Sequence, residues 1–92
     1  MVKIKKAGTK SWVTFTLPKE IGSSVELSGE WSGWEREPMR KKKSGEFYLR
    51  RKLPNTQSYE FGYCIDGTTW HYEESLELVA SPFDSYNALL VL

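Results

Sequence analysis

The chain has 92 residues and a mass of 10.7 kDa, which fits one domain rather than two. Size scaling predicts that folding buries about 65% of the unfolded surface, enough for one modest core and too little for a catalytic barrel or a two-lobed enzyme. Aromatic residues make up 14% of the chain, with four Trp, five Tyr and four Phe, and this content excludes intrinsic disorder.

The charge is nearly balanced overall but unevenly distributed. The net charge is +1, yet residues 1–52 carry all 13 Lys and Arg with 6 acids, whereas residues 53–92 carry 6 acids and no Lys or Arg. There is no apolar run of about 18 residues and no apolar signal-peptide segment, so we expect no membrane partner and a cytoplasmic location. The single cysteine, Cys64, fits a reducing compartment because it has no partner for an internal disulfide.

Apolar residues alternate with polar ones along the chain, a period of two that is typical of half-buried β-strands. The pattern predicts strands at 13–17, 25–28, 47–53, 59–65, 68–72 and 87–92. A proline or glycine ends each of the first three, and Asp66-Gly67 is the dipeptide most typical of a tight hairpin turn. Within residues 73–80 we expect a helical turn.

Six or seven short strands predict an all-β fold, an antiparallel β-sandwich, with a five-stranded oligonucleotide-binding barrel as the alternative. Arg51 falls on the apolar phase of its strand, so either its side chain extends past the core to solvent or the strand bulges there. We expect residues 1–10 to be an N-terminal basic segment and residues 11–92 to be a single β-sandwich module.

Residues that could support catalysis are few. Cys64 and His71 lie across the predicted hairpin from each other, so we expect a packed cysteine and a surface histidine rather than a nucleophile and its base. Glu73 and Glu74 are adjacent, so in an extended chain they point in opposite directions and cannot flank one glycosidic bond. A lone histidine offers no metal site. We therefore expect no catalytic residues, no metal and no cofactor.

Lysines and arginines cluster at residues 40–43 and 50–52. Basic residues interleaved with aromatic ones can bind single-stranded nucleic acid, but the near-zero net charge argues against this, since such affinity comes mainly from neutralising phosphates. The alternative is a solvated hairpin whose charges protect a sheet edge. We adopt that alternative and expect no nucleic-acid partner.

Two tryptophans lie in the short segment 29–34, directly after a predicted strand. Because so short a loop cannot easily bury two indoles, we expect Trp31 in the core and Trp34 on the surface. Trp70 follows the predicted hairpin turn among polar neighbours. Exposed indoles on a sheet form flat platforms that suit the C–H face of a sugar ring, whose hydroxyl rim needs amide and hydroxyl partners. Composition alone leaves open that Trp34 and Trp70 are both core residues.

The order of these motifs resembles a known family, the α-glucan-binding modules of isoamylases, branching enzymes and the β subunit of AMP-activated protein kinase. The resemblance covers about residues 11–92, and it depends on the ordered occurrence of several weak motifs. These motifs read Gly29-Glu30-Trp31-Ser32-Gly33-Trp34, Pro38-Met39, Gly45-Glu46-Phe47, Leu53-Pro54, Phe61-Gly62-Tyr63-Cys64-Ile65-Asp66-Gly67, Trp70 and Asn87.

The resemblance implies an immunoglobulin-like, early-set β-sandwich that binds α-1,4-glucans such as glycogen and starch without activity of its own. By position, Trp34 and Trp70 correspond to the stacking platform and Asn87 to the amide that hydrogen-bonds glucose hydroxyls. Ser85 stands where the kinase modules have a threonine, and Phe83 where a leucine leans over the sugar.

Two positions depart from the family pattern. Gly62 replaces the sugar-contacting lysine when the alignment is anchored on Asp66-Gly67, and Glu60, two residues earlier on the same face, is expected to reach a sugar hydroxyl instead. Glu73-Glu74 replaces the Asp-Pro that follows the tryptophan.

The sequence therefore predicts a non-catalytic module that binds α-1,4-glucans by aromatic stacking. A glycan-processing enzyme is a second expected partner. The alternative function is a protein-docking domain of a glycan enzyme or kinase complex that has lost sugar binding, and a small nucleic-acid-binding barrel is the third.

Overall fold

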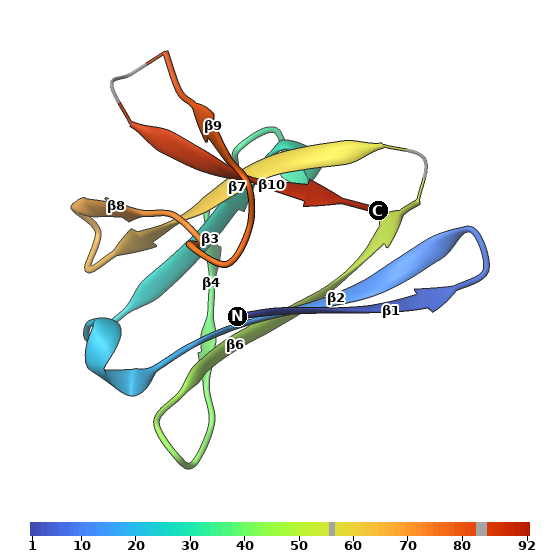
Figure 1. Cartoon of the computed structure of the whole chain (residues 1–92). Helices are drawn as coiled ribbons and strands as arrows, with labels where there is room; N and C mark the ends of the chain where they lie inside the picture. Colours follow the sequence, from blue (N-terminus) through green and yellow to red (C-terminus); the bar gives the residue numbers. More distant parts are fainter. Residues whose placement is uncertain (56, 83–84) are drawn as a thin grey trace.

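The computed structural model describes residues 1–55, 57–82 and 85–92, which form two antiparallel sheets in two layers (Figure 1). The first sheet has the strand order β1-β2-β6-β5, and the second has the order β4-β3-β7-β10-β9, with β8 paired to β7. The strands of the first sheet are β1 (Val2–Ala7), β2 (Lys10–Leu17), β6 (Phe47–Pro54) and β5 (Arg40–Lys41). Those of the second are β4 (Glu37–Pro38), β3 (Val25–Gly29), β7 (Ser58–Ile65), β10 (Tyr86–Val91), β9 (Leu78–Ala80) and β8 (Thr69–His71). The predicted all-β antiparallel sandwich is confirmed.

The core lies between the two layers and is built by alternation along the strands. On β2 the side chains of Val13, Phe15 and Leu17 are buried while the threonines between them are half-exposed. On β7 the side chains of Phe61 and Tyr63 point into the same core, and both are fully buried. This alternation turns the intervening residues of β7 to the outer face of the second sheet.

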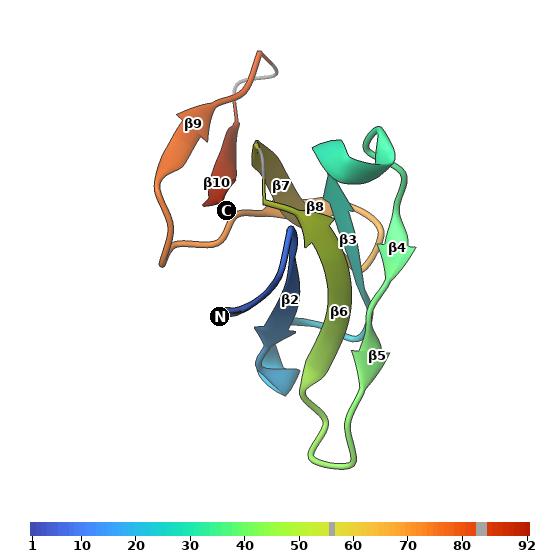
Figure 2. The same cartoon turned by 90° about the vertical axis from the view of Figure 1, so that its right-hand side faces the viewer.

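The chain crosses from one layer to the other at Met39. Residues 37–38 pair with β3, whereas residues 40–41 pair with β6 in the opposite sheet (Figure 2). Met39 between them is buried, and its N–H donates to the Val25 carbonyl oxygen at 2.9 Å. Two short 3₁₀ turns, η1 (Lys19–Ile21) and η2 (Glu30–Ser32), complete the described elements.

The structure confirms the strand predicted over residues 59–65 and the turn that ends it. Asp66 has φ 51° and Gly67 has φ 74°, the positive values that a tight hairpin turn requires of its central residues. The return strand, β8, pairs Trp70 with Cys64 across this hairpin. The last predicted strand is also present, as β10.

The helical turn expected within residues 73–80 was a wrong prediction. The Leu76 N–H donates to the Glu73 carbonyl oxygen in an isolated turn, and the chain then extends as β9. β9 completes the edge of the second sheet by pairing with β10. Extended pairing satisfies backbone groups of β10 that a helix there would leave open.

Two further details concern the first sheet. The β2–β6 register continues without a bulge through Arg51, which is opposite Val13, and the guanidinium forms an ion pair with Glu37. Of the two alternatives for Arg51, a bulge or a side chain that extends past the core, the second is therefore correct. Within the basic segment 1–10, residues 2–7 form β1, a strand that the alternation analysis did not predict. Among the described residues, no helix is long and apolar enough to cross a membrane.

Candidate functional site

The outer face of the second sheet carries most of the predicted site residues. Glu60 and Gly62 are on this face because their neighbours Tyr59, Phe61 and Tyr63 point into the core. On the adjacent strand β10, Ala88 is opposite Phe61 and is buried with it, so Asn87 belongs to the outer face.

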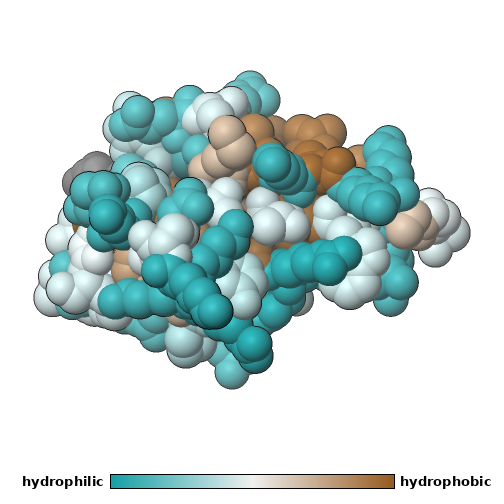
Figure 3. Space-filling model, turned by 90° about the horizontal axis from the view of Figure 1, so that it is seen from below, coloured by the Kyte–Doolittle hydropathy of each residue, from teal (hydrophilic) through white to brown (hydrophobic). Residues whose placement is uncertain are grey.

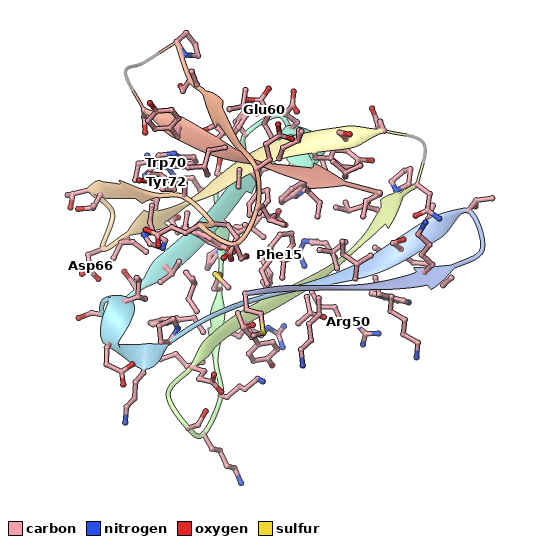
Figure 4. All side chains as sticks on the ribbon, viewed as in Figure 1. Phe15, Arg50, Glu60, Asp66, Trp70 and Tyr72 are labelled. Carbon is pink, nitrogen blue, oxygen red and sulfur yellow. The ribbon has the colours of Figure 1, made fainter. Side chains whose placement is uncertain are left out.

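Trp70 lies directly over Gly62. A Cβ atom added to Gly62 would be 2.5 Å from Cε2 of the indole, and closer still to Cζ2. The indole Nε1–H donates to the Tyr86 carbonyl oxygen at 3.0 Å, which fixes the ring against the start of β10. Figure 4 shows Trp70 beside β8, with Tyr72 close to it. The absence of a side chain at residue 62 is therefore what allows the Trp70 ring to lie against the sheet.

Trp34 approaches the same face from the loop after η2. Gly33 and Trp34 have consecutive left-handed backbone conformations, with φ 65° and 67°, and a bulky residue rarely adopts this conformation. The turn is held because the Trp34 N–H donates to the Gly29 carbonyl oxygen at 2.9 Å and its own carbonyl oxygen accepts from the Ser28 hydroxyl at 2.9 Å. The side chain remains 40% exposed. An indole at the surface is therefore held by a strained backbone conformation.

The two indoles form one side of a hollow of about 580 Å³. The centroids of the Trp34 and Trp70 rings are 6.3 Å apart, and the ring planes are inclined by 53°. We call this the tryptophan hollow, and it is lined by Glu30, Trp34, Glu60, Trp70, Ser81, Pro82, Ser85 and Asn87. Such a concave surface, with two aromatic rings and a few polar groups, matches the chemistry of a small-molecule or sugar site.

The polar groups of the hollow are linked by hydrogen bonds. Asn87 Nδ2 donates to Glu60 Oε1 at 3.2 Å, and the Glu60 backbone N–H donates to Glu30 Oε1 at 2.6 Å. Asn87 is 8% exposed, so its amide is held rigidly. An amide has two donor hydrogens and an acceptor oxygen, so hydrogen-bonding capacity remains for a ligand in the hollow.

Of the predicted site residues, Trp34, Trp70, Asn87, Ser85 and Glu60 come together at this one hollow. Phe83, the remaining one, lies outside the described residues. The five described residues come from four separate segments of the chain and meet at one surface, as a shared binding site requires. Their roles toward a ligand remain predictions.

Trp31 takes the inner position expected of it, though it is half-buried rather than fully enclosed. Its ring stacks on Phe15 with the centroids 5.5 Å apart, and its Nε1–H donates to Glu37 Oε1 at 2.9 Å. Glu37 also pairs with Arg51, so this carboxylate links the indole of the η2 turn to a guanidinium of β6.

Sequence reasoning missed three residues that line the hollow, namely Glu30, Ser81 and Pro82. Glu30 stands inside the same 29–34 motif as Trp34, and this position in the motif was the signal that could have identified it. The other two follow β9, a strand that was itself not predicted.

A second hollow, of about 480 Å³, shares Glu30 with the first. We call it the neighbouring hollow, and it is lined by Glu30, Trp31, Lys52, Leu53, Pro54, Gln57, Ser58 and Tyr59. It contains the same combination of an aromatic surface with amide, hydroxyl and carboxylate groups.

The residues considered for catalysis lie elsewhere. Cys64 is buried, and among the described residues no group of three or more His, Cys, Asp or Glu side chains could hold a metal ion. Glu73 is also buried, and its carboxylate accepts from the Tyr63 hydroxyl at 3.0 Å, from Ser75 and from the amine of Met1. Burial opposes ionisation, but these hydrogen bonds and the positive amine hold the pKa of Glu73 below its ordinary value. Burial and the neighbouring Glu73 carboxylate raise the pKa of Tyr63. This cluster is a buried hydrogen-bond network rather than part of either hollow.

Comparison with models of known protein families gives one match, over residues 12–92. The matched family is described as the glycogen recognition site of AMP-activated protein kinase. The match includes every residue that lines the tryptophan hollow. Comparison with curated proteins gives no matching relative.

Proposed function

Because this chain belongs to the family of glycogen recognition sites of AMP-activated protein kinase, we propose that it binds α-1,4-glucans by stacking glucose rings on Trp34 and Trp70. The family is one of carbohydrate-binding modules, and the binding unit that we propose spans residues 11–92. Its ligands would be glycogen, starch and maltooligosaccharides.

The observation that supports this proposal best is the pairing of one exposed and one half-buried indole with a hydrogen-bonded amide. Trp34 and Trp70 present aromatic surface in one hollow, and the Asn87–Glu60 pair lies in the same hollow. A glucose unit has an apolar C–H face for the indoles and a hydroxyl rim for the amide and carboxylate. The strained backbone at Trp34 fits this role, since strain is often retained where a surface side chain must be presented.

The proposed contacts predict weak binding. Each ring face buried against sugar contributes at most about 1.5–3 kcal/mol. Hydrogen bonds that replace bonds to water add about 1 kcal/mol each. The resulting Kd lies between about 10 μM and several mM.

We propose that binding is not followed by turnover. The two carboxylates of the hollow have structural partners, since Glu60 accepts from Asn87 and Glu30 accepts from the Glu60 backbone. Neither is placed as a free acid opposite a free base, as glycoside hydrolysis requires. A glycan-processing enzyme acting on the same glucan is the partner that such a module would serve.

The test is calorimetric titration of the purified chain with maltoheptaose. We expect Trp34→Ala and Trp70→Ala each to abolish detectable binding and Asn87→Ala to weaken it. Trp12→Ala is the matched control, because Trp12 is on the outer face of the other sheet and should not affect glucan affinity. Unchanged affinity in the Trp34 and Trp70 variants would refute the proposal, as would release of shorter glucans by the pure protein.

A further inference from the structure

The outer face of the first sheet, opposite the tryptophan hollow, carries a regular array of cations. Lys3 and Lys5 on β1 share one face with Thr14 and Trp12 of β2, which are in turn opposite Arg50 and Lys52 of β6. We call this array the basic face, defined by Lys3, Lys5, Trp12, Thr14, Arg50 and Lys52. Figure 3 views this side of the molecule and shows hydrophilic side chains extending across much of it. In Figure 4 the Arg50 side chain extends away from the second sheet, on which Glu60 and Trp70 lie.

Among the described residues, no ion pair neutralises the positive charge of this face. The four strands of the first sheet contain no Asp or Glu, and all of their residues are described. The ion pairs formed among the described residues involve Arg36, Arg51 and the amine of Met1, so none of them uses a cation of the basic face. Lys3, Lys5, Arg50 and Lys52 are all exposed.

Aromatic rings restrain the cations of this face. The guanidinium carbon of Arg50 is 4.1 Å from the centroid of the Trp12 ring, and Lys52 Nζ is 5.4 Å from the same centroid. Beyond the basic face, Lys42 in the loop after β5 has its Nζ 5.8 Å from the centroid of the Tyr48 ring on β6. Such contacts hold long side chains in place, which lowers the entropy lost when they bind an anion.

The register gives the array a definite spacing. Lys3 and Lys5 are two residues apart on one strand, as are Arg50 and Lys52, so each pair is separated by about 6.8 Å along the strand. The two pairs are separated by two strand spacings, roughly 9.6 Å. Alternate residues of any extended polypeptide have the same spacing of about 6.8 Å. These spacings are those of the Cα atoms, and the long side chains extend from them to reach a ligand. An extended segment lying along β2 would bring one carboxylate to the row of Lys3 and Arg50, and the next to the row of Lys5 and Lys52.

We propose that the basic face is a docking surface for an acidic protein segment in extended conformation, with acids at alternate positions. Because the basic face and the tryptophan hollow are on opposite sheets, one molecule can hold a glucan and a protein partner at the same time. The proposal does not depend on glucan binding.

Two features of the basic face favour a polypeptide over other polyanions. Single-stranded nucleic acid needs open rings for base stacking, whereas Trp12 and the nearby Tyr48 are half-buried and each already has a cation over its ring. The strand register of the cations also matches the spacing of alternate residues in an extended polypeptide, which a polyphosphate or an anionic membrane does not share.

The test uses the full chain and a ten-residue peptide of alternating Glu and Thr, titrated at low and moderate salt. The comparison ligands are a peptide of the same composition with its glutamates consecutive, a ten-nucleotide oligothymidylate, and phosphatidylserine-containing vesicles. We expect the alternating peptide to bind most tightly, with an affinity that falls about tenfold or more as salt screens the charges.

A variant with Lys3, Lys5, Arg50 and Lys52 all changed to Gln should lose this binding while keeping its fold and its maltoheptaose affinity. The matched control removes the same charge away from the basic face, at Lys6, Lys19, Arg36 and Lys43, and should keep most of the peptide affinity. An equal loss in both variants would mean that net charge alone attracts the peptide, and this would overturn the proposal. No binding at low salt, equal affinity for the two peptides, or tighter binding of the oligonucleotide or vesicles would overturn it as well.

Discussion

A side chain at Gly62 should damage the tryptophan hollow through Trp70. A Cβ atom there would be 2.5 Å from Cε2 of the indole, whereas ordinary carbon contacts are about 3.5–4.0 Å, so the ring must move by roughly 1 Å. Its hydrogen bond to the Tyr86 carbonyl oxygen is 3.0 Å long, and such a displacement stretches it beyond hydrogen-bond distance. Gly62→Ala should therefore displace one of the two proposed stacking rings.

The expected loss follows from the contribution of one ring. Losing most of about 1.5–3 kcal/mol of stacking raises the Kd for maltoheptaose roughly 10- to 150-fold. Gly62→Lys, which restores the family's residue, should weaken binding at least as much, because the lysine Cβ meets the same ring. Isothermal titration measures both, and tighter binding by Gly62→Lys would refute the reasoning.

A double-mutant cycle separates this mechanism from a general loss of stability. In urea unfolding, Gly62→Ala should cost about 1–3 kcal/mol in the wild-type background through overpacking. The cost should vanish in a Trp70→Ala background, where the space above Gly62 is open. Equal costs in the two backgrounds would show that the indole is not the cause.

The remaining predictions concern stability, pH and ligand length. Trp31→Ala should cost about 3–5 kcal/mol of unfolding free energy, whereas Trp34→Ala should leave the Tm nearly unchanged; a thermal melt with the reverse order would contradict the placement of this loop. Because the folded pKa of Glu73 is depressed, its contribution to stability is complete above the unfolded pKa of about 4.3 and is lost as the pH falls through the folded pKa. Urea unfolding at pH 6 and pH 3 should therefore show a smaller acid loss for Glu73→Gln than for wild type, and equal losses would argue against it. Since the two hollows share Glu30, we expect a long glucan to extend from the tryptophan hollow into the neighbouring hollow. Ser58→Trp in the neighbouring hollow should then weaken maltoheptaose binding several-fold and spare maltotriose, and an equal effect on both ligands would exclude this extension.

Strands with both a buried face and a solvated face could be predicted from the sequence alone. The alternation in β2 and β7 reports burial directly, and the Asp66-Gly67 turn follows from the positive φ that these residue types tolerate. β1 and β9 escaped prediction because both are edge strands. Ile4, which points inward from β1, is still 44% exposed. An edge strand so little buried does not need alternating apolar and polar residues, so its sequence lacks the pattern on which the strand predictions depended.

The candidate site was predictable only in part, for a similar reason. The tryptophans and Asn87 belong to local motifs, so their positions could be read along the chain. The contact of Trp70 with Gly62 is created by the β7–β8 pairing, and no local pattern encodes it. The family resemblance indicated only that residue 62 is a glycine where a lysine is expected. The structure shows that the Trp70 indole fills the space above this glycine.

The most direct measurement is the movement of the indole N–H signals in a proton–nitrogen NMR spectrum during titration with maltoheptaose. The chain has four tryptophans, two in the tryptophan hollow, one packed against the core and one on the basic face. Glucan binding in the hollow predicts that the Trp34 and Trp70 signals shift together along one saturation curve, while that of Trp12 stays fixed. Shifts confined to Trp12, or no shift of Trp34 and Trp70 at millimolar ligand, would contradict glucan binding in the tryptophan hollow.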